Sequence, residues 1–290
     1  MNSFHTEQNG LDGWLPTELG LLDKLLEINF NDNRLSGELP IEISKISELE
    51  IFSVKFNALS GAIPSEISSL SSLEVLDVSY NYFTGVLPSW LGNLGYLREF
   101  KVSSNLITGS VPSEFGNMVH LRKISVSNNY FSAIPSEIGH LTLLKSFDAE
   151  NNTLIGSLPT ELGHLGNLEY LYLSSNNLKS SIPTKIGNMK KLLFLGLDQN
   201  ELTGSIPSEL GDLSDLRVLS LFSNNLTGDI PTSLLGLDNL LHLDVLSGND
   251  LSLSNDLTEE TFCEKDDLTV WVDCQNQESC SCCECEGARR

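Results

Sequence analysis

The sequence is poor in aromatic residues, in basic residues and in long apolar stretches. Phe, Trp and Tyr together make up 7% of the 290 residues, so aliphatic side chains must fill most of any core. Only 17 Lys and Arg residues stand against 39 Asp and Glu residues, and the formal charge is −22 at pH 7. Nucleic acids and anionic membrane surfaces bind basic patches of proteins, so the excess of acidic residues argues against both as partners. No stretch approaches the roughly 20 consecutive apolar residues of a membrane-spanning helix.

Further absences bear on location and chemistry. Cysteine is missing from residues 1–262, and residues 1–6 have neither the basic nor the apolar region of a signal peptide. The G-x-S-x-G, H-E-x-x-H and phosphate-loop motifs are also missing. His140 and His164 share a repeat position that Asn or Asp occupies in other repeats, which indicates a solvated face, and His120 and His242 lack metal-ligand spacing. We therefore predict a protein without catalytic activity, cofactor or bound metal.

The dominant pattern of the chain is a repeat of 24 residues. Every proline falls in one register, with a single interval of 23 residues: Pro16, Pro40, Pro64, Pro88, Pro112, Pro135, Pro159, Pro183, Pro207 and Pro231. A column of asparagines has the same phase: Asn33, Asn57, Asn81, Asn105, Asn129, Asn152, Asn176, Asn200 and Asn224. Such self-similarity at a fixed period is the sequence pattern of repeat architectures.

The unit from Leu168 to Lys191 shows how one repeat should fold. Leu171 and Leu173 alternate with outward residues at the period of a strand. The asparagine that follows has donors and an acceptor for backbone groups at the turn, so the stacked asparagines should form a ladder. Glycine permits the angles of the turn, proline fixes the start of the return segment, and apolar residues three apart predict a short helical turn there. Because parallel strands need a long crossover, we predict an α/β solenoid with a parallel sheet on its concave face and short 3-10 or helical turns on its convex face.

The repeat resembles a known family. Its fullest copy is residues 192–215: Leu192, Leu195, Leu197, Asn200, Leu202, Gly204, Ile206, Pro207, Leu210, Gly211 and Leu213. This unit, L-x-x-L-x-L-x-x-N-x-L-x-G-x-I-P-x-x-L-G-x-L, resembles the plant-type class of leucine-rich repeats over residues 1–239. The resemblance implies a relation to receptor-kinase ectodomains, receptor-like proteins and polygalacturonase-inhibiting proteins, which are extracellular recognition modules. The chain ends in a Cys-rich segment, Trp271-Val272-Asp273-Cys274 followed by Cys280-Ser281-Cys282-Cys283-Glu284-Cys285. This segment resembles the C-terminal cap of algal leucine-rich-repeat proteins.

These patterns divide the chain into three parts. Residues 1–239 hold ten repeats, residues 240–257 form a degenerate last repeat, and residues 258–290 form an acidic, Cys-rich cap or tail. The end of a solenoid exposes a slice of core and needs a cap, and apolar alternation predicts a closing strand over 268–274. The first repeat has no cap before it. Either residues 1–10 form a frayed cap, or the sequence is a fragment of a longer protein. We favour the fragment, whose missing start could carry a secretion signal.

The cysteines all follow residue 262: Cys263, Cys274, Cys280, Cys282, Cys283 and Cys285. We favour disulfides, which imply an oxidising location outside the cell or at its surface, although the sequence does not choose the pairing. A thiolate metal cluster is the rival interpretation, because C-x-C-C-x-C occurs in metal-binding tails. The third interpretation is that the cysteines are free thiols. Asn151 and Asn225 begin glycosylation sequons, which matter only if the chain is secreted.

Outward strand residues carry the predicted binding site, because folding does not dictate their identity. Aromatic residues gather at these positions in coils eight to ten, and we expect an exposed patch of Tyr170, Tyr172, Phe194 and Phe222. Asp148, Glu150 and Asp198 should form its polar rim. Exposed aromatic patches are typical of binding interfaces. The alternative is that these rings merely cover neighbouring strands and bind no ligand.

The sequence thus predicts a recognition scaffold for a protein, peptide or glycan ligand. It would be either a receptor-type ectodomain or a secreted protein in signalling or defence. The alternative is a structural or adhesive protein of the cell surface or matrix. A regular ice-binding surface is less favoured, because the convex columns mix charged, small and bulky residues.

Overall fold

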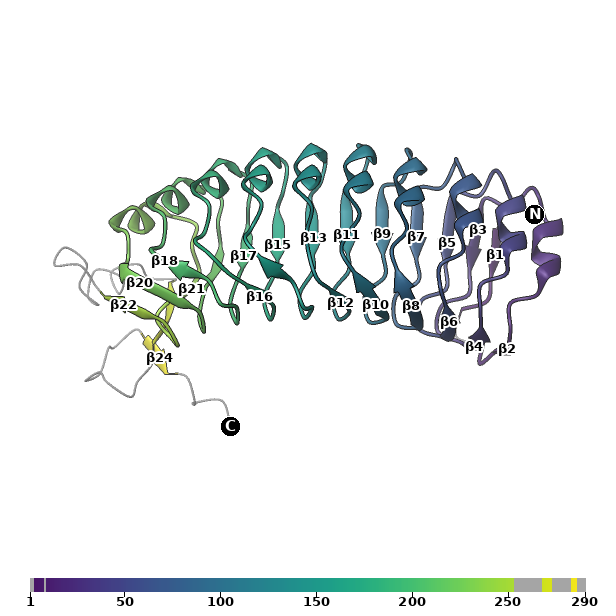
Figure 1. Ribbon diagram of the computed structural model, residues 1–290, viewed down its shortest axis with the longest axis horizontal. Coiled ribbons are helices and arrows are strands. Elements are labelled where there is room, and N and C mark those ends of the chain that lie inside the picture. Colours follow the sequence, from purple (N-terminus) through teal and green to yellow (C-terminus); the bar gives the residue numbers. More distant parts are fainter. Residues whose placement is uncertain (1–2, 8, 253–267, 273–282, 286–290) are drawn as a thin grey trace. The chain divides into compact units, whose positions relative to one another are not determined.

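The computed structural model describes residues 3–7, 9–252, 268–272 and 283–285. The chain forms two compact units, residues 1–153 and residues 154–290, and each is treated by itself. In both units a coil consists of a strand, a turn, a short flanking strand and a 3-10 helix, which returns the chain to the next coil (Figure 1).

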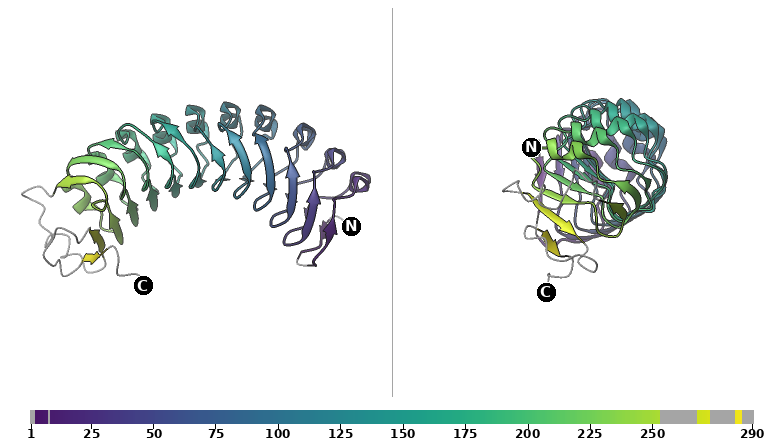
Figure 2. Two further views of the ribbon diagram at one scale, coloured as in Figure 1. Left: turned by 60° about the horizontal axis from the view of Figure 1, so that its bottom comes forward. Right: turned by 90° about the vertical axis from the view of Figure 1, so that its left-hand side faces the viewer.

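The first unit contains one parallel sheet that forms its strand face: β1 (Ser3–His5), β3 (Glu27–Asn29), β5 (Ile51–Ser53), β7 (Val75–Asp77), β9 (Glu99–Lys101), β11 (Lys123–Ser125) and β13 (Ser146–Asp148). Shorter strands flank it: β2 (Asp12–Gly13), β4 (Arg34–Gly37), β6 (Ala58–Gly61), β8 (Tyr82–Val86), β10 (Leu106–Gly109) and β12 (Tyr130–Phe131). The 3-10 helices lie on the opposite side (Figure 2): η1 (Thr17–Leu21), η2 (Ile41–Lys45), η3 (Ser65–Ser69), η4 (Ser89–Asn93), η5 (Ser113–Asn117) and η6 (Ser136–His140).

The second unit repeats this plan. Its strand face consists of β15 (Tyr170–Tyr172), β17 (Phe194–Gly196), β19 (Val218–Ser220), β21 (His242–Asp244), β23 (Thr269–Val272) and β24 (Cys283–Cys285). The flanking strands are β14 (Ile155–Gly156), β16 (Asn177–Leu178), β18 (Thr203–Gly204), β20 (Asn225–Asp229) and β22 (Asp250–Ser252). The helices are η7 (Thr160–His164), η8 (Thr184–Asn188), η9 (Ser208–Asp212) and η10 (Thr232–Gly236).

The period of the sequence sets the register of the strands. On the strand face of each unit, a strand residue pairs with its equivalent in the next coil, as Ile51 does with Val75 and Phe194 does with Val218. Inward residues such as Leu76 and Leu195 are fully buried between the strand face and the helices. Each 3-10 helix begins directly after a proline of the repeat. The predicted solenoid of parallel strands and short 3-10 turns is confirmed.

Asparagine side chains join neighbouring coils at the ends of the strands. In Asn105 the amide nitrogen donates to the carbonyl oxygens of Val102 and Ser103 in its own coil and of Val78 in the preceding coil, over 3.0–3.3 Å. Its Oδ1 accepts the backbone N–H of Phe83 at 2.9 Å. Asn81, Asn129, Asn200 and Asn224 make the same four kinds of contact and are also buried. One amide per coil therefore satisfies backbone groups that would otherwise be buried without partners.

The ladder extends one coil beyond the predicted column. Asn249 accepts the backbone N–H of Leu226 at 3.0 Å and donates to the carbonyl oxygens of Leu221 and Val245 at 2.9 Å. One extra residue precedes Asn249 in this degenerate coil, so it lies 25 residues after Asn224 and out of the 24-residue period.

Replacing Asn105 with Ala should lower the free energy of unfolding by about 3 kcal/mol, because a buried N–H and buried carbonyl groups lose their partners. Urea denaturation followed by circular dichroism measures the change. The control is Asn117→Ala on the exposed end of η5, for which we expect a change of less than about 0.5 kcal/mol. Equal losses in the two variants would contradict this role of the ladder.

Adjacent helices approach so closely that some positions accept only glycine. A Cβ added at Gly92 in η4 would lie 2.5 Å from the carbonyl oxygen of Glu114 and 2.8 Å from the Glu114 Cβ. A Cβ added at Gly95, three residues later, would have no such neighbour within 4 Å. The tight stacking of coils, not the local backbone angle, therefore requires glycine at residue 92.

We expect Gly92→Ala to destabilise the protein by about 2 kcal/mol, since η5 must shift away to accept the methyl group. Gly95→Ala should change the stability by less than about 0.5 kcal/mol. The two midpoints of urea unfolding, measured side by side, test this difference. A Gly92→Ala protein as stable as the Gly95→Ala protein would show that the helices are not in backbone contact.

Candidate ligand-binding surface

Three aromatic rings gather on the strand face of the second unit. Tyr170 and Tyr172 project from β15 with ring centroids 6.2 Å apart and nearly parallel planes, and Phe194 of β17 lies 4.5 Å from Tyr172. All three side chains are half-buried. Gly196 leaves the space for this contact, because a Cβ there would meet the Phe194 ring at 2.8 Å. We call Tyr170, Tyr172 and Phe194 the aromatic cluster.

The remaining predicted residues of the second unit differ from the expectation. Asp198 is buried, with an exposed fraction of 9%, and its Oδ1 accepts a hydrogen bond from the Ser174 hydroxyl at 2.6 Å. Asp198 is therefore a buried residue beside the aromatic cluster. The prediction that Asp198 belongs to an exposed polar rim was wrong. Phe222 is half-buried and lies two residues after β19. The ring contacts given above connect Tyr170, Tyr172 and Phe194 and do not include Phe222.

Asp148 and Glu150, the other two predicted rim residues, belong to the first unit. The Asp148 carboxylate accepts hydrogen bonds from the hydroxyls of Ser125 and Ser127 at 3.1 and 2.7 Å and from the backbone N–H of Glu150 at 3.2 Å. Asp148 therefore ends a chain of hydroxyl groups along β11 and β13. The sequence pattern did not reveal this network, because Ser and Asp are also common on ordinary solvated strands.

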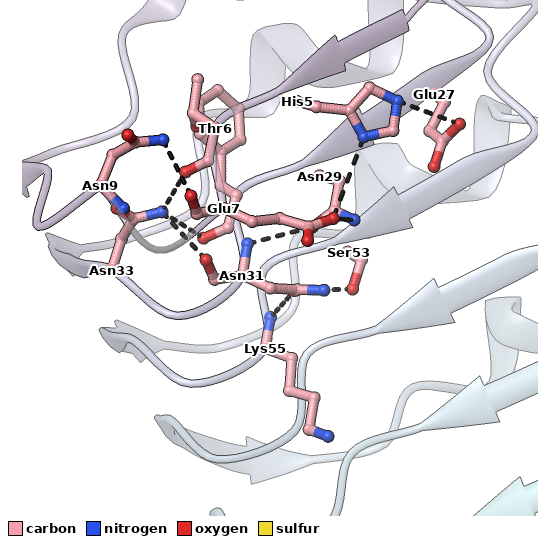
Figure 3. Close-up of polar contacts among 11 residues, drawn as sticks. His5, Thr6, Glu7, Asn9, Glu27, Asn29, Asn31, Asn33, Ser53 and Lys55 are labelled. Carbon is pink, nitrogen blue, oxygen red and sulfur yellow. Dashed lines mark hydrogen bonds and ion pairs between the residues drawn. The ribbon is translucent and has the colours of Figure 1, made fainter.

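A second polar network lies at the first coils of the first unit (Figure 3). The His5 imidazole lies 3.4 Å from a Glu27 carboxylate oxygen, and Glu7 accepts from the Asn29 amide. Asn31 accepts from the Ser53 hydroxyl at 2.8 Å and from the backbone N–H of Lys55 at 2.6 Å. Figure 3 shows the Lys55 side chain extending away from these groups.

Other predicted residues are placed as follows. The sequon residues Asn151 and Asn225 are exposed, as are His140 and His164. Cys263, Cys274, Cys280 and Cys282 lie outside the described residues, and Cys283 and Cys285 belong to β24. Within the described segments no helix has the length and apolarity to cross a membrane, and no three His, Cys, Asp or Glu side chains are grouped as metal ligands.

Comparison with known proteins identifies the repeat. A model described as a leucine-rich repeat region matches residues 105–282, and a leucine rich repeat model matches residues 71–131. No curated protein matches the chain.

Several solved structures are similar to the chain. A TDR receptor has 30% identity and a TM-score of 0.87, over 94% of this chain and 47% of that one. The Arabidopsis receptor kinase HAESA ectodomain, in complex with an IDA peptide hormone ligand, has 29% identity and a TM-score of 0.81, over 91% of this chain and 44% of that one. A plant ice-binding protein has 28% identity and a TM-score of 0.72, over 86% of this chain and 79% of that one.

The chain thus spans about half the length of the two receptor structures. The model match covers more than half of the chain, in agreement with the stacked coils and the asparagine ladder. The chain belongs to the leucine-rich-repeat family, and its repeat is of the plant type.

Proposed function

We propose that this chain is the ligand-binding part of a receptor-like leucine-rich-repeat protein and binds a peptide on its strand face. The aromatic cluster carries the proposal. Tyr170, Tyr172 and Phe194 remain partly accessible, although nothing in the fold requires aromatic residues at outward strand positions. The complex of the similar HAESA ectodomain with a peptide hormone supports a peptide as the class of ligand.

The geometry of the cluster suits an extended segment. Large aromatic side chains give contact area with few rotatable bonds, and they are enriched among residues that dominate binding energy. The contact of Phe194 with Tyr172 fixes the rings before a ligand arrives, which lowers the entropy lost on binding. The buried Ser174–Asp198 hydrogen bond joins the same two coils beside the rings. The cluster therefore offers a preformed apolar surface with tyrosine hydroxyls at its edge.

The wider proposal concerns location and organisation. Receptor structures are among the similar proteins, so we place the chain outside the cell, with residues 258–290 as a cap and with Asn151 and Asn225 as glycosylation sites. It would bind without catalysing a reaction. An adhesive role in a matrix is the alternative, and retention by matrix material without any soluble ligand would favour it.

Ice binding is a second candidate, because the plant ice-binding protein is similar over most of its length. In the second unit a groove of about 650 Å³ is lined by hydroxyl residues of neighbouring coils, which are Ser181, Thr184, Ser205, Ser208 and Thr232. These hydroxyls repeat once per coil. Inhibition of ice recrystallisation by the purified chain would support this function, whereas crystals that coarsen as fast as in buffer would exclude it.

Peptides selected from a random display library on the immobilised full chain test the main proposal. Tyr172→Ala and Phe194→Ala should each weaken binding of the selected peptides by about tenfold or more, because each removes part of the apolar contact.

The matched control is Tyr82→Ala with Tyr130→Ala, which removes two exposed rings from the flanking strands of the first unit. We expect it to leave the affinity unchanged. Failure to enrich any peptide, or equal losses in the cluster and control variants, would refute peptide binding at the cluster.

A further inference from the structure

The charges on the strand face of the first unit are paired unevenly. Glu74 pairs with Arg98 at 3.0 Å, Glu99 pairs with Lys101, and Asp77 accepts the backbone N–H of Ser79. The ion pairs of the described residues involve neither Lys55 nor Arg122 nor Lys123. The chain has 39 acidic and 17 basic residues, and these three cations lie on or beside the strand face. Their charges therefore remain available to a ligand on that face.

Lys55 is held in place by two aromatic rings. Its ammonium lies 4.6 Å from the centroid of Phe56 and 5.5 Å from that of Tyr80, and the two rings stack at 4.1 Å. Contacts of this kind attract a cation through the ring faces without neutralising its charge. The ammonium is thus positioned but keeps its capacity to bind an anion.

The two rings occupy an unfavourable backbone position. Phe56 and Tyr80 have φ values of 55° and 56° and exposed fractions of 40% and 43%. In other coils the same position holds small polar or amide residues: Asp32, Ser104, Asn128, Asn151, Ser175, Gln199 and Ser223. Bulky residues reach positive φ only at a cost in energy, and half-exposed rings recover little of it by burial. This cost points to a role outside folding.

Arg122 and Lys123 supply a second group of cations three coils further on. Both are exposed at the start of β11. The backbone N–H of Lys123 donates to the Arg98 carbonyl at 3.1 Å, and that of Lys145 donates to the Arg122 carbonyl at 2.8 Å. The backbone of Arg122 thus lies between Arg98, whose charge Glu74 neutralises, and Lys145 of the next coil. Arg122 and Lys123 themselves are two adjacent exposed cations on a strongly negative chain.

We propose that the strand face of the first unit binds an acidic peptide segment, with carboxylates at Lys55 and at Arg122 and Lys123. Strands β5 and β11 are three spacings apart, about 14 Å, and Lys55 lies four residues further along the strand direction than Lys123, about 13 Å. An extended peptide spans the resulting separation of about 19 Å with about six residues. The segment would therefore carry acidic side chains about six positions apart. The general negative charge repels such a segment at long range, but salt at physiological strength screens that repulsion beyond about 8 Å. This inference rests on the proposed function for the class of ligand, a peptide. It places the acidic segment on the strand face of the first unit and not on the aromatic cluster.

The test is fluorescence anisotropy of a labelled deca-glutamate peptide with the full chain in 150 mM salt. We expect saturable binding, no binding of deca-glutamine, and a loss of about tenfold or more in Arg122→Glu with Lys123→Glu. Lys190→Glu with Lys191→Glu changes the net charge equally on residues outside the strand face and should alter the affinity by less than about twofold. Equal losses in the two double variants, or no binding by the unmodified chain, would overturn the proposal.

Phe56→Asn with Tyr80→Asn tests the role of the rings without changing any charge. We expect the affinity to fall by about threefold because Lys55 loses its fixed position, while the melting temperature stays the same or rises. Unchanged affinity would remove Lys55 and the rings from the site. Dextran sulfate that binds as tightly as deca-glutamate and with the same variant losses would overturn the peptide class.

Tyr172→Ala with Phe194→Ala separates this surface from the aromatic cluster. Binding of deca-glutamate should persist in that variant, even if the library peptides no longer bind. Its loss there would contradict a distinct acidic-peptide surface, whereas loss of the library peptides alone concerns the proposed function.

Discussion

The buried asparagine amide is the interaction on which each unit depends. A strand-to-turn junction inside a stacked coil leaves backbone N–H and carbonyl groups away from water, and an unsatisfied group there is costly. The amide of Asn105 satisfies groups of its own coil and of the preceding one. Each coil is therefore completed by its neighbour, which explains why a single repeat has no stable fold of its own. It also fixes where every strand ends.

Fixed strand ends leave the outward residues free to vary. Inward leucines and phenylalanines are almost fully buried, whereas outward residues contact mainly each other and solvent. The first unit uses this freedom for Lys55, Arg122 and hydroxyl networks, and the second uses it for aromatic rings. Each unit thus presents its own chemistry on the same backbone plan.

The sequence was sufficient to predict the solenoid, because one period combines strand alternation, asparagine, glycine and proline in a fixed order. Asn249 was missed because one inserted residue moves it out of the period, although its hydrogen bonds are those of the ladder. The contact between Tyr172 and Phe194 depends on the small Gly196, and the burial of Asp198 depends on Ser174 in the preceding coil. The position of Lys55 depends on rings from two coils. Such contacts between side chains of different coils do not follow from a column pattern.

Ligands should contact the strand face and not the helix face. A photoreactive benzoylphenylalanine placed at Tyr170 on β15, or at the exposed Tyr96 near η4, tests it directly with a peptide selected on the unmodified chain. We expect a cross-linked product at residue 170 that unlabelled peptide suppresses, and none at residue 96. A suppressible product at residue 96 together with none at residue 170 would contradict binding on the strand face.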